Sequence, residues 1–121
     1  MKIILLSTLT LVITTLIFFS CTKDKVDIVI NPNCIDTMYY TTQVEPILNQ
    51  SCATSNCHDA MTSAAGYDFT NHANVSDNAN RILSVIRHES GYLPMPTDTP
   101  KLSDSIAQQI ECWILQGTLN N

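Results

Sequence analysis

The residues best suited to chemistry are two cysteines and a histidine close together in the chain. Cys52 and Cys57 are separated by four residues, and His58 directly follows Cys57. Covalent attachment of haem uses two cysteines, one for each vinyl group, and a histidine just after the second that reaches the iron. The usual pattern is C-x-x-C-H, whereas this chain has C-x-x-x-x-C-H. The longer loop can still span both vinyl groups if it bulges outward, so the motif is compatible with a haem attachment site.

The same three residues allow other interpretations. Cys52 and Cys57 can form a local disulfide, with His58 an ordinary surface residue. A structural zinc ion is a second alternative, and it needs a fourth ligand from Cys34, Cys112, His72 or His88. Free thiols are disfavoured outside the cytoplasm, where thiols are oxidised. The motif alone favours haem and the disulfide equally.

Met95 adds a second candidate metal ligand. It lies between Pro94 and Pro96, and prolines restrict the backbone, so the thioether can be presented from a loop with little loss of conformational entropy. A lone methionine more often fills a gap in a core. The flanking prolines and the amphipathic segment that follows favour Met95 as the distal ligand of an iron whose proximal ligand is His58.

Two further histidines and three cations could also contribute to such a site. His72 or His88 in place of Met95 would give a bis-histidine site of lower reduction potential, but surface or capping roles are favoured for both. His88 falls near the end of a predicted helix, where a protonated imidazole complements the helix dipole. The cations available to haem propionates are Arg81, Arg87 and Lys101, for which solvated surface positions are the default.

Three segments carry helical patterns that would position these groups. In the first, Thr42 and Glu45 have the spacing of a capping box, and an apolar face leads to a helix end near 50–52. The second, 77–88, has an apolar stripe and Ser76 as candidate N-cap. The third, 103–116, has apolar residues at helical spacing and Gly117 where a left-handed cap belongs. Segments 60–74 and 91–101 are predicted loops, and no stretch alternates with a period of two, so the fold class predicted is all-α.

The start of the chain predicts export. A short basic start is followed by a mainly apolar stretch, 3–19, and then by Ser20 and Cys21. This resembles the lipobox of bacterial lipoproteins, in which the cysteine is acylated and becomes the mature N-terminus. An uncleaved membrane anchor and an ordinary signal peptide are the alternatives. We therefore expect a signal peptide at 1–20, lipidation at Cys21, a tether at 21–37 and one domain at 38–121.

The order of these features resembles the small class I c-type cytochromes, in particular exported lipoprotein cytochromes. The resemblance covers roughly 40–119 and rests on Pro46-Ile47-Leu48 before the C…CH run, the Met-Pro loop, and Trp113-Ile114 followed by Gly117. It implies three to four helices around one haem c. It also implies thioethers at Cys52 and Cys57, with His58 and Met95 as axial ligands.

Two cysteines remain after this assignment. With Cys21 assigned to lipid, and Cys52 and Cys57 to haem, the remaining pair is Cys34 and Cys112. We expect a disulfide between these two, and two isolated buried thiols are the alternative. The bridge would join the end of the tether to the last helix.

The predicted function is electron transfer by a membrane-anchored monohaem cytochrome, not catalysis. Without residues 1–20 the net charge is −6, which argues against nucleic acid as a partner. The expected partners are redox proteins and, through the lipid anchor, a bacterial membrane at its periplasmic or cell-surface face. One rival is a cofactor-free binding module held by disulfides. The other is a haem enzyme in which Met95 leaves the iron.

Overall fold

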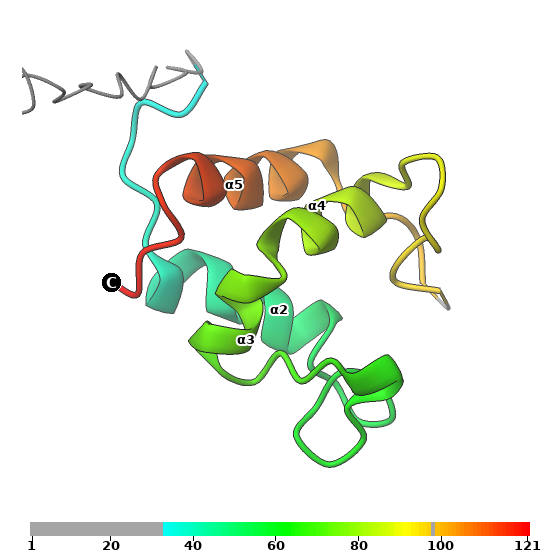
Figure 1. The fold of residues 1–121 in the computed structure, drawn as a ribbon. Helices are drawn as coiled ribbons and strands as arrows, with labels where there is room; N and C mark the ends of the chain where they lie inside the picture. The colour runs from blue at the N-terminus through cyan, green and yellow to red at the C-terminus, as the bar shows by residue number, and fades with distance from the viewer. Residues whose placement is uncertain (1–32, 98) are drawn as a thin grey trace, which may run out of the picture.

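The computed structural model describes residues 33–97 and 99–121. The predicted signal peptide, Cys21 and most of the tether lie outside the described residues. The elements, in chain order, are the π-helical turn η2 (Tyr40–Val44), α2 (Glu45–Ser51), the 3-10 turn η3 (Ala64–Gly66), α3 (His72–Asp77), α4 (Ala79–Arg87) and α5 (Asp104–Leu115) (Figure 1). The described part of the chain contains no strand, which confirms the all-α prediction. Within these same ranges no helix is both long and apolar enough to cross a membrane.

The first helical segment begins earlier than the sequence predicted, and the capping box at Thr42 is not formed. The N-cap is Tyr39, whose backbone N–H donates to the side-chain oxygen of Gln43 at 2.7 Å. The next two backbone N–H groups are satisfied by Asn121: Tyr40 donates to Oδ1 at 2.9 Å and Thr41 to the carbonyl oxygen at 3.1 Å. Asn121, about 80 positions away in the sequence, therefore provides the hydrogen bonds that the sequence assigned to a local capping box. The predicted end of the helix is confirmed, because α2 ends at Ser51 and Cys52 is its C-cap.

The second predicted helix, 77–88, is confirmed as α4, which runs from Ala79 to Arg87, and it is preceded by a short helix that the sequence did not predict, α3. Asn71 caps α3 by accepting a hydrogen bond from the Asn74 N–H, and the chain kinks at Asn78 before α4. Ser76 is therefore not an N-cap. It lies inside α3, where its hydroxyl is bonded to the hydroxyl of Thr118 at 2.8 Å. The start of α3 also falls in the segment that was predicted to be a loop.

The last helix matches its prediction closely. Ser103 caps α5 through its side-chain oxygen, which accepts from the Ile106 N–H. The helix ends at Leu115, and Gly117 has φ +93°, a conformation that glycine adopts without the steric cost of a Cβ atom.

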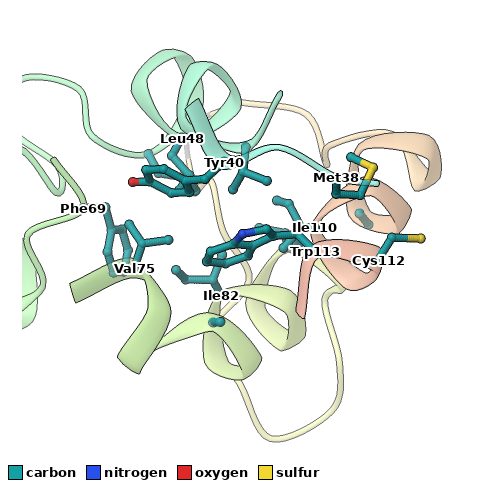
Figure 2. Close-up of a cluster of buried hydrophobic side chains, with 14 residues drawn as sticks. Met38, Tyr40, Leu48, Phe69, Val75, Ile82, Ile110, Cys112 and Trp113 are labelled. Carbon is teal, nitrogen blue, oxygen red and sulfur yellow. The ribbon is translucent and has the colours of Figure 1, made fainter. Parts of the chain in front are cut away.

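The core surrounds the indole of Trp113 on α5 (Figure 2). Trp113 is 1% exposed, its ring lies 5.5 Å from that of Tyr40 on η2, and its Nε1 donates to the Leu119 carbonyl oxygen at 2.9 Å. The largest fully buried side chains come from all four helices and η2, and they are Trp113, Leu48, Ile86, Ile110, Val44 and Val75. The chain's own side chains thus form a continuous core.

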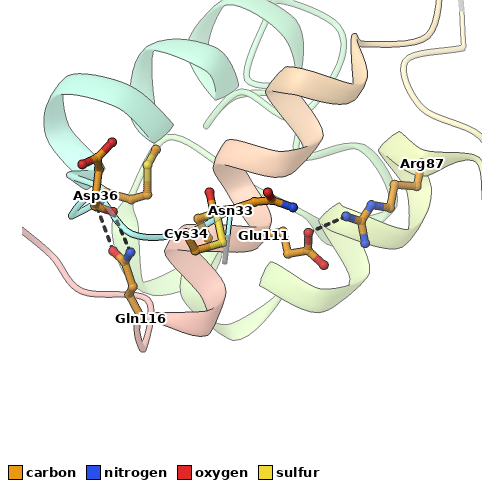
Figure 3. Close-up of a disulfide and its surroundings, with 8 residues drawn as sticks. Asn33, Cys34, Asp36, Arg87, Glu111 and Gln116 are labelled. Carbon is orange, nitrogen blue, oxygen red and sulfur yellow. Dashed lines mark hydrogen bonds and ion pairs between the residues drawn. A yellow bond between two sulfur atoms is a disulfide. The ribbon is translucent and has the colours of Figure 1, made fainter. Parts of the chain in front are cut away.

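A disulfide joins Cys34 to Cys112, as predicted. It links the segment before η2 to the C-terminal part of α5 (Figure 3). The bridge closes a loop of 78 residues, which corresponds to a stabilisation of about 3 to 5 kcal/mol in the chain-entropy model. The side chain of Gln116 adds two hydrogen bonds to the same segment, from its Nε2 to the Asp36 carbonyl oxygen and from the Met38 N–H to its Oε1.

The hydrogen bonds of Asn121 can be tested by substitution. Asn121→Ala removes the side-chain bonds to the Tyr40 N–H and to the Met38 carbonyl oxygen. Two such bonds correspond to a loss of about 1 to 3 kcal/mol in the free energy of unfolding, which urea titration measures. The control is Asn120→Ala, because Asn120 is exposed; it should change stability by less than about 0.5 kcal/mol. Equal effects of the two substitutions would contradict this capping role.

Candidate functional site

One apolar pocket opens beside the loop that follows α2. Its volume is about 130 Å³ and it is partly open to solvent, so it is smaller than typical ligand sites, which measure about 300 to 1,000 Å³. The lining residues are mostly apolar, and they are Cys52, His58, Ala65, Tyr67, Phe69, Arg81, Ile82, Val85, Ile86, Leu93 and Met95. Three of the four residues predicted to hold haem, Cys52, His58 and Met95, therefore line a single cavity.

The loop from Cys52 to His58 is closed by backbone hydrogen bonds. The Cys52 N–H donates to Leu48 at 2.8 Å, and the His58 N–H donates back to the Cys52 carbonyl oxygen at 3.0 Å. Between them, the Cys57 N–H donates to the Thr54 carbonyl oxygen at 3.0 Å and Asn56 has φ +67°. The four intervening residues thus fold into a compact turn that brings His58 back beside the end of α2.

The two thiols of this loop have different surroundings. Cys52 is buried and lines the pocket, whereas Cys57 is exposed and lies outside the lining. Burial raises the pKa of the Cys52 thiol to about 11, and the nearby Cys57 adds to the rise. Both are free thiols in the structure, so the local disulfide that the sequence also allowed is not formed there.

The orientation of the His58 ring is set by a backbone carbonyl. Its Nδ1 lies 3.2 Å from the carbonyl oxygen of Tyr67. A carbonyl oxygen only accepts, so Nδ1 carries the hydrogen and the Nε2 of the neutral ring keeps a free lone pair. The ring also packs against Phe69, with 4.8 Å between ring centroids. This is the arrangement of a metal-binding histidine, in which the second nitrogen is fixed by an outer hydrogen bond.

The other two histidines are used differently. The Nε2 of His72 lies 2.8 Å from the Thr118 carbonyl oxygen, and its ring packs edge-on against Tyr40 and Trp113. The Nε2 of His88 lies 3.3 Å from the Met95 carbonyl oxygen. Neither histidine lines the pocket, whereas Met95 does.

Met95 is tied to the end of α4 by its backbone. Its N–H donates to the Val85 carbonyl oxygen at 3.1 Å, and its side chain is half-buried in the pocket lining. The neighbouring Leu93 is 66% exposed and forms part of the mouth. The Met-Pro loop therefore covers one side of the cavity.

Arg81 is the cation at this pocket. Its guanidinium lies 5.4 Å from the ring centroid of Tyr67 and 5.9 Å from that of Tyr92. The two other basic residues of the described ranges form ion pairs, Arg87 with Glu111 at 2.8 Å (Figure 3) and Lys101 with Asp104 at 3.3 Å. Among the lysines and arginines of the described ranges, Arg81 is thus the one without a carboxylate partner.

The zinc alternative has no support in the described ranges, where no group of three or more His, Cys, Asp or Glu side chains is arranged to hold a metal ion. Two of its candidate ligands, Cys34 and Cys112, are joined to each other in the disulfide.

The sequence did not predict that Tyr67 and Phe69 would form an aromatic side of the pocket, because both residues lie in a segment without helical or strand periodicity. Two aromatic residues in an otherwise polar loop were the available signal.

The contrast between the thiols predicts unequal reactivity. At pH 8, folded protein with free thiols should be alkylated by iodoacetamide at Cys57 at least about ten-fold faster than at Cys52, because the thiolate is the reactive form and Cys52 is buried with a raised pKa. Peptide mapping by mass spectrometry measures both rates. In 6 M guanidinium chloride the two rates should converge; faster labelling of Cys52 in the folded state would refute its burial.

Comparisons with protein-family models, with curated proteins and with solved structures found no match to this chain. The pocket is therefore interpreted from its own geometry and chemistry.

Proposed function

We propose that this chain is an exported, lipid-anchored electron carrier that holds one haem c in the pocket beside Cys52. Cys52 and Cys57 would carry the thioether bonds, and His58 and Met95 would be the axial ligands. The single observation that carries the proposal is the convergence of Cys52, His58 and Met95 on one apolar cavity, although Met95 comes from a different loop.

The donor set and the lining suit this group. An imidazole with a free Nε2 and a thioether are the ligand pair of high-potential haem sites, and Cys52 places an unpaired thiol at the cavity wall. The mainly apolar walls match a porphyrin face, while Arg81 offers a positive charge for a carboxylate at the same cavity. Haem, when bound, supplies an iron centre that gains and loses one electron.

The chain's own residues would tune and protect that centre. The Tyr67 carbonyl oxygen fixes the tautomer and orientation of His58, and such an outer bond also raises the basicity of the imidazole. Phe69, Ile82 and Ile86 are buried side chains of the lining, and they would exclude water from one side of the pocket. If His58 and Met95 both held the haem iron, no position would be left on it for a substrate, which favours electron transfer over catalysis.

The proposed thioether role of Cys57 depends on the conformation of the loop from Cys52 to His58. Its thiol is exposed and lies outside the lining, but it immediately precedes His58 in the turn after α2. Asn56 in this turn has a positive φ, and the proposal assigns to the turn the outward bulge that a C-x-x-x-x-C-H spacing would need. An exposed thiol is also accessible to the factors that attach haem.

Export is supported by the disulfide. The Cys34–Cys112 bridge is typical of oxidising compartments, in agreement with the signal peptide predicted at 1–20. Cys21 would anchor the chain to the membrane, leaving the residues before Cys34 as a tether that the disulfide joins to the folded domain.

The first test measures the cofactor directly. Full-length protein expressed with haem-maturation factors should show a pyridine haemochrome spectrum of haem c, and its intact mass should exceed that of the lipidated polypeptide by one haem. Cys52→Ala should lose one of the two thioethers and shift the haemochrome maximum. A colourless product with Cys52 bonded to Cys57 would instead establish the cofactor-free module.

The second test concerns the distal ligand. Met95→Ala should abolish the weak long-wavelength absorption band of thioether-ligated ferric haem and lower the reduction potential, because the soft thioether favours ferrous iron. Met61→Ala is the matched control, since Met61 is 93% exposed and should leave band and potential unchanged. Persistence of the band in Met95→Ala would disprove this ligand, and a high-spin ferric spectrum of the unsubstituted protein would favour the haem enzyme.

A further inference from the structure

We infer that His88 is a positioning residue that holds Met95 at the pocket, an inference that rests on the proposed function. Both backbone polar groups of Met95 bond to the end of α4. Its N–H donates to the Val85 carbonyl oxygen at 3.1 Å, and its carbonyl oxygen accepts from Nε2 of His88 at 3.3 Å. The last turn of α4 and the residue that caps it thus form a clamp around Met95.

The loop needs such a clamp because it has few other attachments. Pro94 and Pro96 flank Met95 and have no backbone N–H to donate. Tyr92 and Leu93, which precede them, are 41% and 66% exposed. Within residues 91–97, the Met95 N–H is the backbone N–H that donates to α4, and the Met95 carbonyl oxygen is bonded to the C-cap residue His88.

The backbone of His88 also points to a role for its side chain. His88 is the C-cap of α4 in the left-handed conformation, with φ +59° and ψ +41°. Glycine is the usual residue at such a helix end, because a Cβ atom disfavours this conformation. His88 adopts this conformation although it has a Cβ atom. Its imidazole is hydrogen-bonded to the carbonyl oxygen of Met95, the proposed iron ligand. His88 does not line the pocket, so it would act only through Met95.

The conformation of His88 makes a clean substitution available. His88→Gly removes the imidazole at a position where glycine is unstrained, so helix capping is preserved. His88→Gln keeps an N–H donor of similar reach. Ser90→Gly is the matched control, a glycine introduced into the same exposed loop at a residue to which no bond of Met95 is made.

The experiment uses the full haem-containing protein in its ferric form, titrated with imidazole, which competes with Met95 for the iron. His88→Gly should increase the apparent affinity for imidazole about three- to ten-fold, the effect of losing one hydrogen bond. It should also weaken the absorption band of the thioether ligand and speed hydrogen exchange of the Met95 amide. His88→Gln should return the affinity to within about two-fold of the unsubstituted protein, and Ser90→Gly should not alter it.

The outcomes separate this inference from the function beneath it. If the unsubstituted protein carries haem with the thioether band, and His88→Gly changes neither imidazole affinity nor Met95 exchange, the clamp is refuted while the cytochrome stands. If His88→Gly raises the imidazole affinity and His88→Gln raises it equally, the hydrogen bond from residue 88 to the Met95 carbonyl oxygen is not what holds Met95 in place. If the unsubstituted protein binds no haem, both the proposed electron-carrier function and the positioning role of His88 are refuted.

Discussion

The contact between Tyr40 and Trp113 is the constraint on which the site depends. It packs η2 against α5 with 5.5 Å between ring centroids, and η2 continues directly into α2, whose C-cap is Cys52. The position of Cys52 relative to the rest of the domain is therefore set by aromatic packing at the other end of the same helical segment. The disulfide and the bonds of Asn121 reinforce this packing from the two chain segments that flank it.

The pocket lies at the edge of the core. Four of its lining residues are also buried members of the core, namely Cys52, Phe69, Ile82 and Ile86. A ligand in the pocket would thus pack against a core that the side chains already form, instead of replacing it. A small domain with a large cofactor is expected to have that cofactor at its centre. Here the centre is instead filled by side chains, the largest of which is Trp113.

Helix α4 has two roles at this site. Its Ile82, Val85 and Ile86 form one wall of the pocket, and its last turn bonds the backbone of Met95. The ion pair between Arg87 and Glu111 holds the same turn against α5. Helix α4 thus connects Met95 to α5. A displacement of the end of α4 would therefore also displace Met95.

The sequence by itself determined the helical class, the extent of α5 and the end of α2, because these follow from local periodicity and capping. It also limited the chemistry open to Cys52, Cys57, His58 and Met95, since residue type and spacing restrict what such groups can do. Only the tertiary structure decided that Asn121 satisfies the backbone N–H groups at the start of η2, that Cys52 is buried while Cys57 is exposed, and that His58 is the histidine that lines the pocket. Those features depend on contacts between residues far apart in the chain, which no local pattern encodes.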